Sequence, residues 1–294
     1  MSTIRVLTTP GWEEYQLLDS GDGMKLERFG NVVLARPEAE AIWRRSLPSS
    51  GWGAAAATFQ TTAEEHGGHW EKHQHLPESW LIQRGSLVCT VRLSASRHVG
   101  IFPEQACQWD WITEKISSAG KMIRVLNLFG YTGLASLAAA QAGAHVTHVD
   151  ASRKVIAWAR ENQARSGLED KPIRWIVDDA VKFIQRESRR GNRYDAIILD
   201  PPKFGRGPRG EVWEFYKLMP ELLRACQAVM SDDPLFLLLT AYAVKASSIT
   251  IGNAVSETLG QLRGETISGE VGLVDQAGRT LSMAVFARWS ATAT

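Results

Sequence analysis

An apolar segment runs into a turn with two glycines at Val125-Leu-Asn-Leu-Phe-Gly-Tyr-Thr-Gly133, and we expect a helix to follow over residues 134–142. Gly130 and Gly133 lack a Cβ, so the backbone can approach a ligand there, and the free N–H groups of the new helix would point toward it. A dinucleotide loop would instead read Gly-x-Gly-x-x-Gly and would hold a pyrophosphate. The segment therefore predicts a cofactor loop without a pyrophosphate cradle, although a plain strand-to-helix turn fits the same spacing.

Carboxylates follow the next three apolar segments of the chain. Asp150 ends the second strand of the expected unit, where a carboxylate can accept from two hydroxyls of a ribose. Asp178 and Asp179 follow the third strand, where a carboxylate can accept from the amine of an adenine, and Asp200 follows the fourth. Each acid alone would also suit a helix N-cap or a turn, but the ordered set predicts a nucleoside site. The three segments cover residues 144–149, 173–177 and 194–199.

The C-terminal part predicts a last parallel strand, a helix rich in alanine and serine, and a hairpin. The strand is expected at residues 234–240, and two segments of alternating polarity follow at 265–274 and 280–289. The loop between them, Asp275-Gln-Ala-Gly-Arg279, has the composition of a turn. We therefore predict an α/β fold with a Rossmann-like, mainly parallel sheet that ends in an antiparallel hairpin.

Composition limits the function classes. The chain has 294 residues, 44% of them hydrophobic, and a net charge of +1, which excludes a protein that binds nucleic acid by overall charge alone. The sequence has no apolar run near the ~20 residues of a membrane span, so we expect a cytoplasmic protein without a membrane partner. Cys89, Cys107 and Cys226 have neither disulfide nor metal-ligand spacing, which agrees with a reducing compartment and no structural zinc.

Residues 1–118 differ in composition from residues 119–294. They contain seven of the eleven tryptophans, and their net charge is 11 − 14 = −3, against 22 − 18 = +4 for the remainder. We predict a small β-rich N-terminal domain over residues 1–118 and the cofactor-binding domain over residues 119–294. Within the first, we expect a helix at residues 37–47, because proline and acids precede arginines, and a polar loop at residues 58–70.

Four histidines, His66, His69, His73 and His75, surround Trp70. No cysteine or acid stands at ligand spacing beside them, so a surface loop is favoured over a metal site.

Residues 121–290 resemble the class I S-adenosylmethionine-dependent methyltransferases. Within that class the resemblance is to bacterial large-subunit ribosomal RNA methyltransferases of the Asp-Pro-Pro-Lys-Phe type. It rests on Leu126-Asn-Leu-Phe-Gly-Tyr-Thr-Gly133, Val149-Asp-Ala-Ser152, Asn162, Gly167-Leu168 and Asp200-Pro-Pro-Lys-Phe204.

The resemblance implies S-adenosyl-L-methionine as the cofactor and assigns roles to the matching positions. Gly130 and Gly133 would pass the methionyl part, Asp150 would hold the ribose, and Asp179 would hold the adenine amine, with Asp178 as the alternative. The implied catalytic residues are Asp200, Pro201, Pro202 and Phe204. The implied cofactor-binding residues are Asn127, Phe129, Gly130, Tyr131, Thr132, Gly133, Asp150, Ala151, Ser152, Asp179 and Ala180.

A segment ahead of the first strand closes over the cofactor in the resembled family. The corresponding segment lies near residues 98–111, and Phe102, Glu104 and Gln105 would contact the cofactor. A connector turn anchored by tryptophans is the alternative reading.

The residues after the fourth strand bear on the methyl acceptor. Methylation of cytosine C5 requires a thiolate that adds to the ring, but Lys203 follows the prolines and Thr240-Ala-Tyr242 follows the next strand. A base nitrogen needs only acceptor oxygens, such as those of Asp200 and the Pro201 carbonyl, and an aromatic partner. Phe204 or Tyr242 would stack on the base.

Basic residues give candidate RNA contacts. Lys203, Arg206 and Arg209 lie in a glycine-rich loop and could bind phosphates, with Lys203, Arg206 and Tyr242 as the expected substrate-binding residues. A second basic run, Arg186, Arg189, Arg190 and Arg193, ends an expected helix, where cations complement the helix dipole.

We expect a methyltransferase that modifies a base nitrogen of RNA, in particular ribosomal RNA. The alternatives are a cytosine-5 ribosomal RNA methyltransferase, an enzyme for a small-molecule or protein acceptor, a non-catalytic RNA-binding protein with the same fold, and a nicotinamide oxidoreductase.

Overall fold

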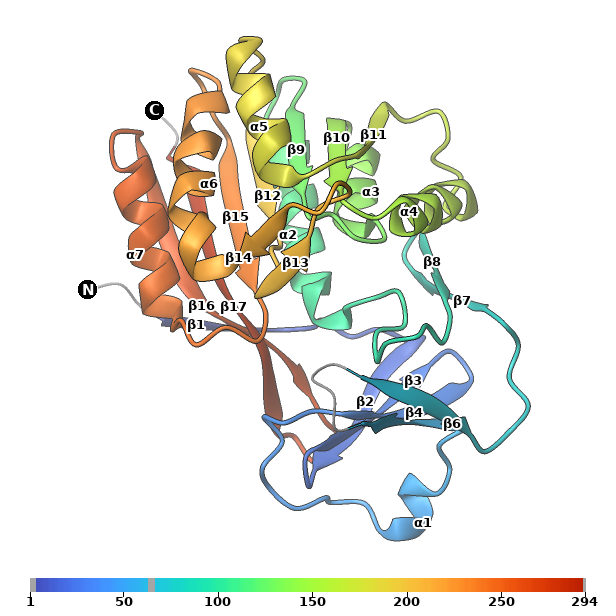
Figure 1. Ribbon diagram of the computed structural model, residues 1–294. Helices are drawn as coiled ribbons and strands as arrows, with labels where there is room; N and C mark the ends of the chain where they lie inside the picture. The colour runs from blue at the N-terminus through green and yellow to red at the C-terminus, as the bar shows by residue number, and fades with distance from the viewer. Residues whose placement is uncertain (1–3, 63–66, 293–294) are drawn as a thin grey trace. The chain divides into compact units, whose positions relative to one another are not determined.

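The computed structural model describes residues 4–62 and 67–292, and the chain forms two compact units (Figure 1). The sheet unit consists of Gln108–Val271 with short segments from both ends of the chain, and the N-terminal unit consists of Thr8–Cys107 with Gly272–Met283. The boundary expected after residue 118 falls at the end of helix α2 (Ala106–Ser117), whereas these units separate near the start of that helix.

The sheet unit is built on an eight-stranded sheet with the order β1-β16-β17-β15-β12-β9-β10-β11. The strands β15, β12, β9, β10 and β11 are parallel neighbours, and β17 pairs antiparallel with β15. The strand bounds are β1 Ile4–Thr8, β9 Arg124–Leu128, β10 His145–Asp150, β11 Ile173–Val177, β12 Ala196–Leu199, β15 Phe236–Ala241, β16 Gly264–Val274 and β17 Thr280–Ala291.

Helices cover both faces of this sheet (Figure 1). Leu126 and Leu128 face a core that includes α5, α6 and α7, whereas Val125 faces a core that includes α2 and α3. Side chains of a strand alternate between the faces, so a strand buried on both sides is apolar throughout. The helix bounds are α3 Leu134–Gln141, α4 Arg153–Arg165, α5 Ala180–Arg189, α6 Phe215–Val229 and α7 Ser248–Leu259.

The strand order contains a switch point between β9 and β12. From β9 the chain proceeds outward to β10 and β11, then returns to the other side of β9 as β12 and continues to β15. Loops that follow the two strands at such a point diverge and leave a crevice for a ligand. The predicted α/β class, with a mainly parallel sheet ending in an antiparallel hairpin, is confirmed.

The N-terminal unit is β-rich, as expected. It contains a five-stranded sheet with the order β2-β3-β4-β5-β6 and a two-stranded sheet, β7-β8. The bounds are β2 Tyr15–Gly21, β3 Met24–Phe29, β4 Val32–Pro37, α1 Ser49–Trp52, β5 Ala57–Thr61, β6 Gly68–Lys72, β7 Trp80–Arg84, β8 Leu87–Val91 and the 3₁₀ turn η1 Pro103–Gln105.

The helix expected at residues 37–47 is wrong. β4 ends at Pro37, the segment then makes turns, and the single helical turn α1 starts only at Ser49. Tertiary hydrogen bonds hold the segment in this form: the Asp19 carboxylate accepts from the N–H groups of Ser46 and Leu47. Weak local helix propensity is readily overridden by such contacts.

The loop expected at residues 58–70 is also wrong for the residues that the structure describes. β5 and β6 occupy most of this stretch and pair antiparallel, with Thr58 opposite Glu71. Phe59 and Trp70 stack edge to face with ring centroids 5.3 Å apart, and such cross-strand aromatic pairs stabilise a sheet. The polar residues Gln60, Thr61 and His69 occupy exposed positions of these two strands.

An ion pair lies inside the five-stranded sheet. Arg36 on β4 donates to both carboxylate oxygens of Glu27 on β3, each at 2.7 Å, and Tyr15 on β2 donates to Glu27 at 2.9 Å. Burial by itself would raise the pKa of Glu27, but the cations of Arg36 and Lys25 hold this pKa below its usual value. Glu27 is therefore ionised, and Arg36, which contacts both of its oxygens, is the nearer of its two cations.

The tip of the β16–β17 hairpin belongs to the N-terminal unit. Arg279 donates to the buried Asp19 at 2.7 Å, and Ser20 donates to the buried Asp275 at 2.8 Å. Residues from opposite ends of the sequence thus complete one buried polar cluster.

Candidate cofactor and acceptor site

The candidate site lies where β9 and β12 end. The two strands pair with Leu199 opposite Leu128, and the Asp200 N–H donates to the Leu128 carbonyl at 3.3 Å. The glycine loop and the Asp200 segment therefore leave the sheet side by side. Asp150 ends β10 on the other side of β9 and pairs with Val177 of β11. The predicted strand tips thus meet at one edge of the sheet.

The glycine loop, residues 129–133, is held in a strained turn. Phe129, Tyr131 and Gly133 have φ of 58°, 50° and 88°. Residues other than glycine rarely adopt this left-handed region of backbone conformation. The Gly130 N–H donates to the Val149 carbonyl at 3.1 Å, which ties the loop to β10. Strain of this kind persists where surrounding contacts fix it, and it is common at ligand sites.

Side chains packed beneath the loop leave little room for a Cβ at either of its two glycines. A Cβ at Gly130 would lie 2.3 Å from Cε1 of His148, and one at Gly133 would lie 3.1 Å from Cβ of Ala159. Approach of a ligand was the reason predicted from sequence. The structure adds a different reason, which is close packing against residues of β10 and α4.

His148 anchors a small buried polar cluster below the loop. Its Nδ1 lies 2.9 Å from Oγ of Ser136, which accepts from Nδ2 of Asn127 at 2.8 Å. The ring also packs on Trp175, with centroids 4.6 Å apart. Burial lowers the pKa of His148 to about 3, so the ring is neutral. His148 was not among the residues predicted from sequence; its only signal there is a histidine within an apolar strand, two residues before Asp150.

The buried His148 makes stability depend on pH. The unfolded chain binds a proton at this histidine below its ordinary pKa of 6.5, whereas the folded protein does so only near pH 3. Acidification through this range therefore favours unfolding. When the pH falls from about 7 to about 5, the free energy of unfolding of the wild type should decrease by about 2 kcal/mol more than that of His148→Gln. Denaturant unfolding at both pH values measures the difference, with His145→Gln, at an exposed position, as the control. Equal losses in all three proteins would contradict the prediction.

Contact between Gly130 and His148 gives a second prediction. Gly130→Ala should lower the free energy of unfolding by about 1–3 kcal/mol and weaken cofactor binding, because the new methyl group collides with the ring. His148→Ala removes the ring, so the double variant should be less destabilised than the sum of the two single variants. Thermal unfolding and calorimetric titration of the four proteins test this coupling, and strict additivity would refute it.

Asp150 is suited to a ribose. Its oxygens accept from the N–H groups of Tyr131, at 3.1 Å, and Ser152, at 2.9 Å. Burial raises the pKa of this half-buried carboxyl group. Each carboxylate oxygen has two lone pairs, so each retains one that can accept from a hydroxyl of a diol. Ser152 caps α4 by accepting from the Val155 N–H, which fixes the segment with Ala151. The acceptor oxygens of Asp150 thus fit the ribose hydroxyls of the cofactor.

Asp178 and Asp179 differ in how much of each carboxylate is already engaged. Asp178 forms an ion pair with Arg186 and accepts from the Asp179 N–H through its other oxygen. Asp179 accepts through Oδ1 from the Lys182 N–H and caps α5, where Ala180 is the first residue. Asp179 therefore retains more capacity for an adenine amine, and its role stays a prediction.

The Asp200 segment is held by Trp213, a residue that was not predicted from sequence. After Pro201 and Pro202 the chain forms a two-stranded hairpin, β13 Phe204–Arg206 with β14 Val212–Glu214. The buried Trp213 donates from Nε1 to the Pro202 carbonyl at 2.6 Å. Its ring packs on Phe129 of the glycine loop, with centroids 4.9 Å apart. Trp213 thus connects the two segments of the site.

Aromatic and basic side chains of the hairpin face solvent. Phe204 is 53% exposed, and Lys203 and Arg206 are also exposed. Phe204 and Arg206 share one face of β13, because alternate residues of a strand point the same way. Tyr242, half-buried, follows β15, whose end neighbours that of β12. These residues can therefore offer a stacking ring and cations to a substrate.

The predicted lid residues lie in the N-terminal unit. Glu104 and Gln105 are buried in η1 and Phe102 is half-buried just before it. Burial raises the pKa of Glu104. Their contact with a cofactor stays a prediction. Of the four histidines around Trp70, His66 lies outside the described residues. Among the residues that the structure describes, no group of three potential metal ligands is present.

Comparison with known proteins identifies the family. A family model described as S-adenosylmethionine-dependent methyltransferase matches residues 60–249. The chain belongs to this family. The crystal structure of the SAM-dependent methyltransferase from Agrobacterium tumefaciens is 45% identical, with a TM-score of 0.94, and the match covers 98% of this chain and 94% of that one. The predicted family, fold class and cofactor, S-adenosyl-L-methionine, are confirmed.

Two other relatives give narrower information about this methyltransferase. The ribosomal RNA large subunit methyltransferase K/L of Shewanella baltica is 42% identical over 97 residues, which are 33% of this chain and 13% of that protein. The chain therefore matches only a small part of that relative. SMU.776, solved as a complex with SAH, is 21% identical with a TM-score of 0.73 over 94% of this chain and 75% of that one, and supports the fold alone.

Proposed function

We propose that this methyltransferase transfers the methyl group of S-adenosyl-L-methionine to a nitrogen of an RNA base, with ribosomal RNA as the substrate class. The observation that carries the proposal is the acceptor segment: Asp200 stands at the switch point, and the exposed ring of Phe204 follows it on a hairpin fixed by Trp213. The name of the Shewanella relative supports ribosomal RNA as the substrate.

The protein's part in such a reaction is mainly to bind and orient. Bound S-adenosyl-L-methionine supplies an electrophilic methyl group on a sulfonium. The Asp200 carboxylate and the Pro201 carbonyl would accept hydrogen bonds from a base amine and direct its nitrogen toward that methyl group. Phe204 or Tyr242 would stack on the base, a contact worth about 1–3 kcal/mol per base. Holding the reactants in line lowers the barrier without acid–base machinery.

Methylation at cytosine C5 is less well supported, because it needs a cysteine thiolate. Cys226 lies on α6 and is fully buried, and burial raises the pKa of its thiol far above the usual value. Cys89 and Cys107 belong to the N-terminal unit. The residues that follow β12 and β15, Lys203 and Tyr242 among them, include no thiol at these strand ends.

A cytoplasmic location is part of the proposal, since ribosomal RNA is its substrate. No helix among residues 4–62 and 67–292 is long and apolar enough to cross a membrane.

The test is a labelling experiment on the purified chain. The protein is incubated with methyl-labelled S-adenosyl-L-methionine and separate pools of unmodified ribosomal RNA, transfer RNA and protein extract, and labelled nucleosides or amino acids are identified by mass spectrometry. We expect an N-methylated base in ribosomal RNA. Labelled 5-methylcytosine would overturn the nitrogen assignment. Label confined to protein, or no label despite tight cofactor binding, would overturn the RNA acceptor.

A further inference from the structure

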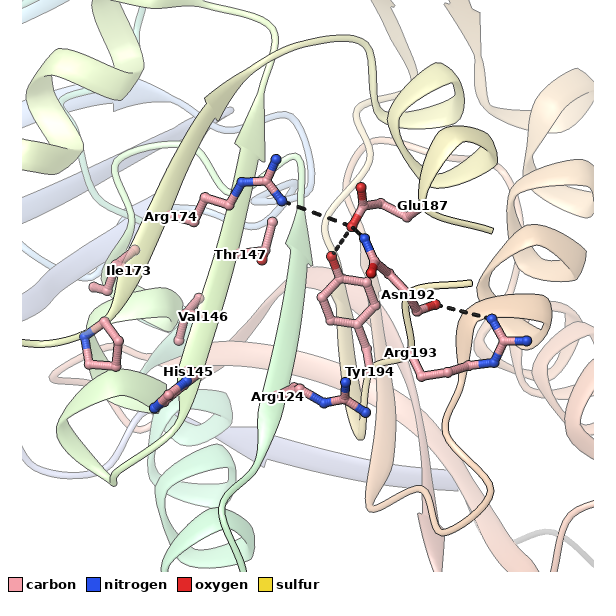
Figure 2. Close-up of a pocket in the computed structure, with 11 residues that line it drawn as sticks. Arg124, His145, Val146, Thr147, Ile173, Arg174, Glu187, Asn192, Arg193 and Tyr194 are labelled. Carbon is pink, nitrogen blue, oxygen red and sulfur yellow. Dashed lines mark hydrogen bonds and ion pairs between the residues drawn. The ribbon is translucent and has the colours of Figure 1, made fainter. Parts of the chain in front are cut away.

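A pocket lies at the edge of the sheet opposite the glycine loop. This cavity has a volume of about 480 Å³. Its lining residues, drawn in Figure 2, belong to the amino ends of β9, β10 and β11, to α5 and to the segment that enters β12. Because these strands are parallel, their amino ends share one edge and their carboxyl ends the other. The polar and charged side chains that line it include Arg124, His145, Arg174, Glu187, Asn192 and Arg193.

Arginines reach this cavity from separate segments. Arg124 begins β9, Arg174 lies on β11, and Arg193 precedes β12. The acidic partners of two of them are distant: Arg124 lies 3.7 Å from Asp195, and Arg174 lies 4.0 Å from Glu187. Arg193 donates to the Asn192 carbonyl at 3.2 Å. All three residues are exposed, so weak ion pairs of this kind leave most of each charge available to an outside anion.

Glu187 is the only carboxylate among the lining residues, and its oxygens already accept hydrogen bonds from neighbouring residues of the protein. Its side chain is 1% exposed. It accepts from the Tyr194 hydroxyl at 2.7 Å and from Asn192 Nδ2 at 2.8 Å, and it pairs with Arg190 at 3.4 Å. The hydrogen bonds on either side of Arg193 fix the backbone that carries it. The lining therefore holds three arginines against one internally paired carboxylate.

We propose that this pocket binds a backbone phosphate of the RNA substrate several nucleotides away from the methylated base, an inference that rests on the proposed function. The guanidinium groups of Arg124, Arg174 and Arg193 match a phosphate, because arginine presents a planar fork of donors. The volume exceeds what a lone ion needs and lies in the range of organic ligand sites. Pro172 and Ile173 supply an apolar wall for the attached sugar and base.

The position of the pocket gives the contact a length requirement. Strands of five residues separate the two edges, and at about 3.3 Å per residue this corresponds to roughly 17 Å. An RNA that reaches both the Asp200 segment and Arg193 must therefore extend well beyond the target base. The basic run 186–193 thus divides by function: Arg186 and Arg190 pair with Asp178 and Glu187, whereas Arg193 serves the pocket.

Charge reversal at Arg193 tests the proposal in the full chain. Binding of fluorescein-labelled single-stranded RNA of about 20 nucleotides is followed by anisotropy over a series of salt concentrations. Arg193→Glu should bind about tenfold more weakly, and the slope of log affinity against log salt should fall in magnitude by about one. Arg193→Lys should recover part of the affinity. Arg224→Glu, at an exposed position of α6, should stay within about twofold of wild type, and S-adenosyl-L-methionine should bind all variants equally.

Three results would overturn the inference. Equal RNA affinity for Arg193→Glu and wild type would show that Arg193 does not contact the RNA. A loss of RNA affinity in Arg224→Glu as large as that in Arg193→Glu would indicate a general charge effect and would also refute the contact. An Arg193-dependent affinity for adenosine monophosphate without an effect on RNA would assign the pocket to a small ligand. Failure of the wild type to bind RNA would overturn this inference together with the RNA acceptor, whereas methyl label in RNA with an inert Arg193 would leave the proposed function standing.

Discussion

Asp200→Ala is expected to reduce methyl transfer at least about 100-fold while changing the affinity for S-adenosyl-L-methionine by no more than about twofold. The Asp200 N–H donates to the Leu128 carbonyl beside the glycine loop. In the proposed mechanism the Asp200 carboxylate accepts from the base, whereas Asp150 holds the ribose. Loss of an acceptor that acts in the transition state lowers kcat more than it lowers binding. Initial rates with labelled cofactor and calorimetric titration measure the two effects separately.

Asp200→Asn provides the matched comparison. Asparagine keeps one acceptor oxygen of similar geometry, so this variant should retain more activity than Asp200→Ala. Asp170→Ala, which removes an exposed carboxylate from a turn, serves as the control and should leave the rate unchanged. Full activity of Asp200→Ala would eliminate the acceptor role. An inactive wild type that still binds RNA would favour the non-catalytic RNA-binding alternative.

Arg36→Ala is expected to destabilise the N-terminal unit by about 3–5 kcal/mol, because it removes the hydrogen-bonded counter-ion of the buried Glu27 carboxylate and leaves only Lys25, 3.9 Å away. Glu27 is fully buried, and Arg36 contacts both of its oxygens. Hydrogen exchange of the amides in β2, β3 and β4 localises the effect to this sheet, and the midpoint of denaturant unfolding gives its size.

The matched variant removes both charges of this pair. Glu27→Leu combined with Arg36→Met should recover much of the stability, since a buried ion pair can often be replaced by apolar side chains of similar volume. Arg28→Ala is the control. It changes a half-buried arginine of β3 that donates to backbone carbonyls, and it should lower the stability by less than Arg36→Ala does. If the double variant were as unstable as Arg36→Ala, packing rather than unpaired charge would explain the loss.

The parallel sheet could be predicted from sequence because its strands are buried on both faces. A segment such as Ile197, Ile198 and Leu199 must be apolar throughout, and an acid directly after it, such as Asp200, marks where burial ends. Parallel strands bring their carboxyl ends to one edge. The order of acids along the chain was therefore enough to place them together.

Features that depend on contacts distant in sequence could not be predicted. Gly130 packs on His148 and Trp213 packs on Phe129, yet neither pair has a spacing that marks a contact. Residues 37–47 show a similar effect in the N-terminal unit, where Asp19 binds the backbone at Ser46 and overrides a local helix pattern. Local pattern is informative where burial is periodic, and it fails where one side chain from elsewhere decides the conformation.

The hairpin tip has a consequence for synthesis of the protein. Asp275 and Arg279 complete the polar interior around Asp19 and Ser20, although they are made by the ribosome some 255 to 260 residues later. The N-terminal unit cannot be completed until residues 272–283 have been synthesised. We therefore expect its strands to lack part of their buried polar cluster while the sheet unit is being synthesised. A fragment cut after residue 107 would carry the same defect permanently.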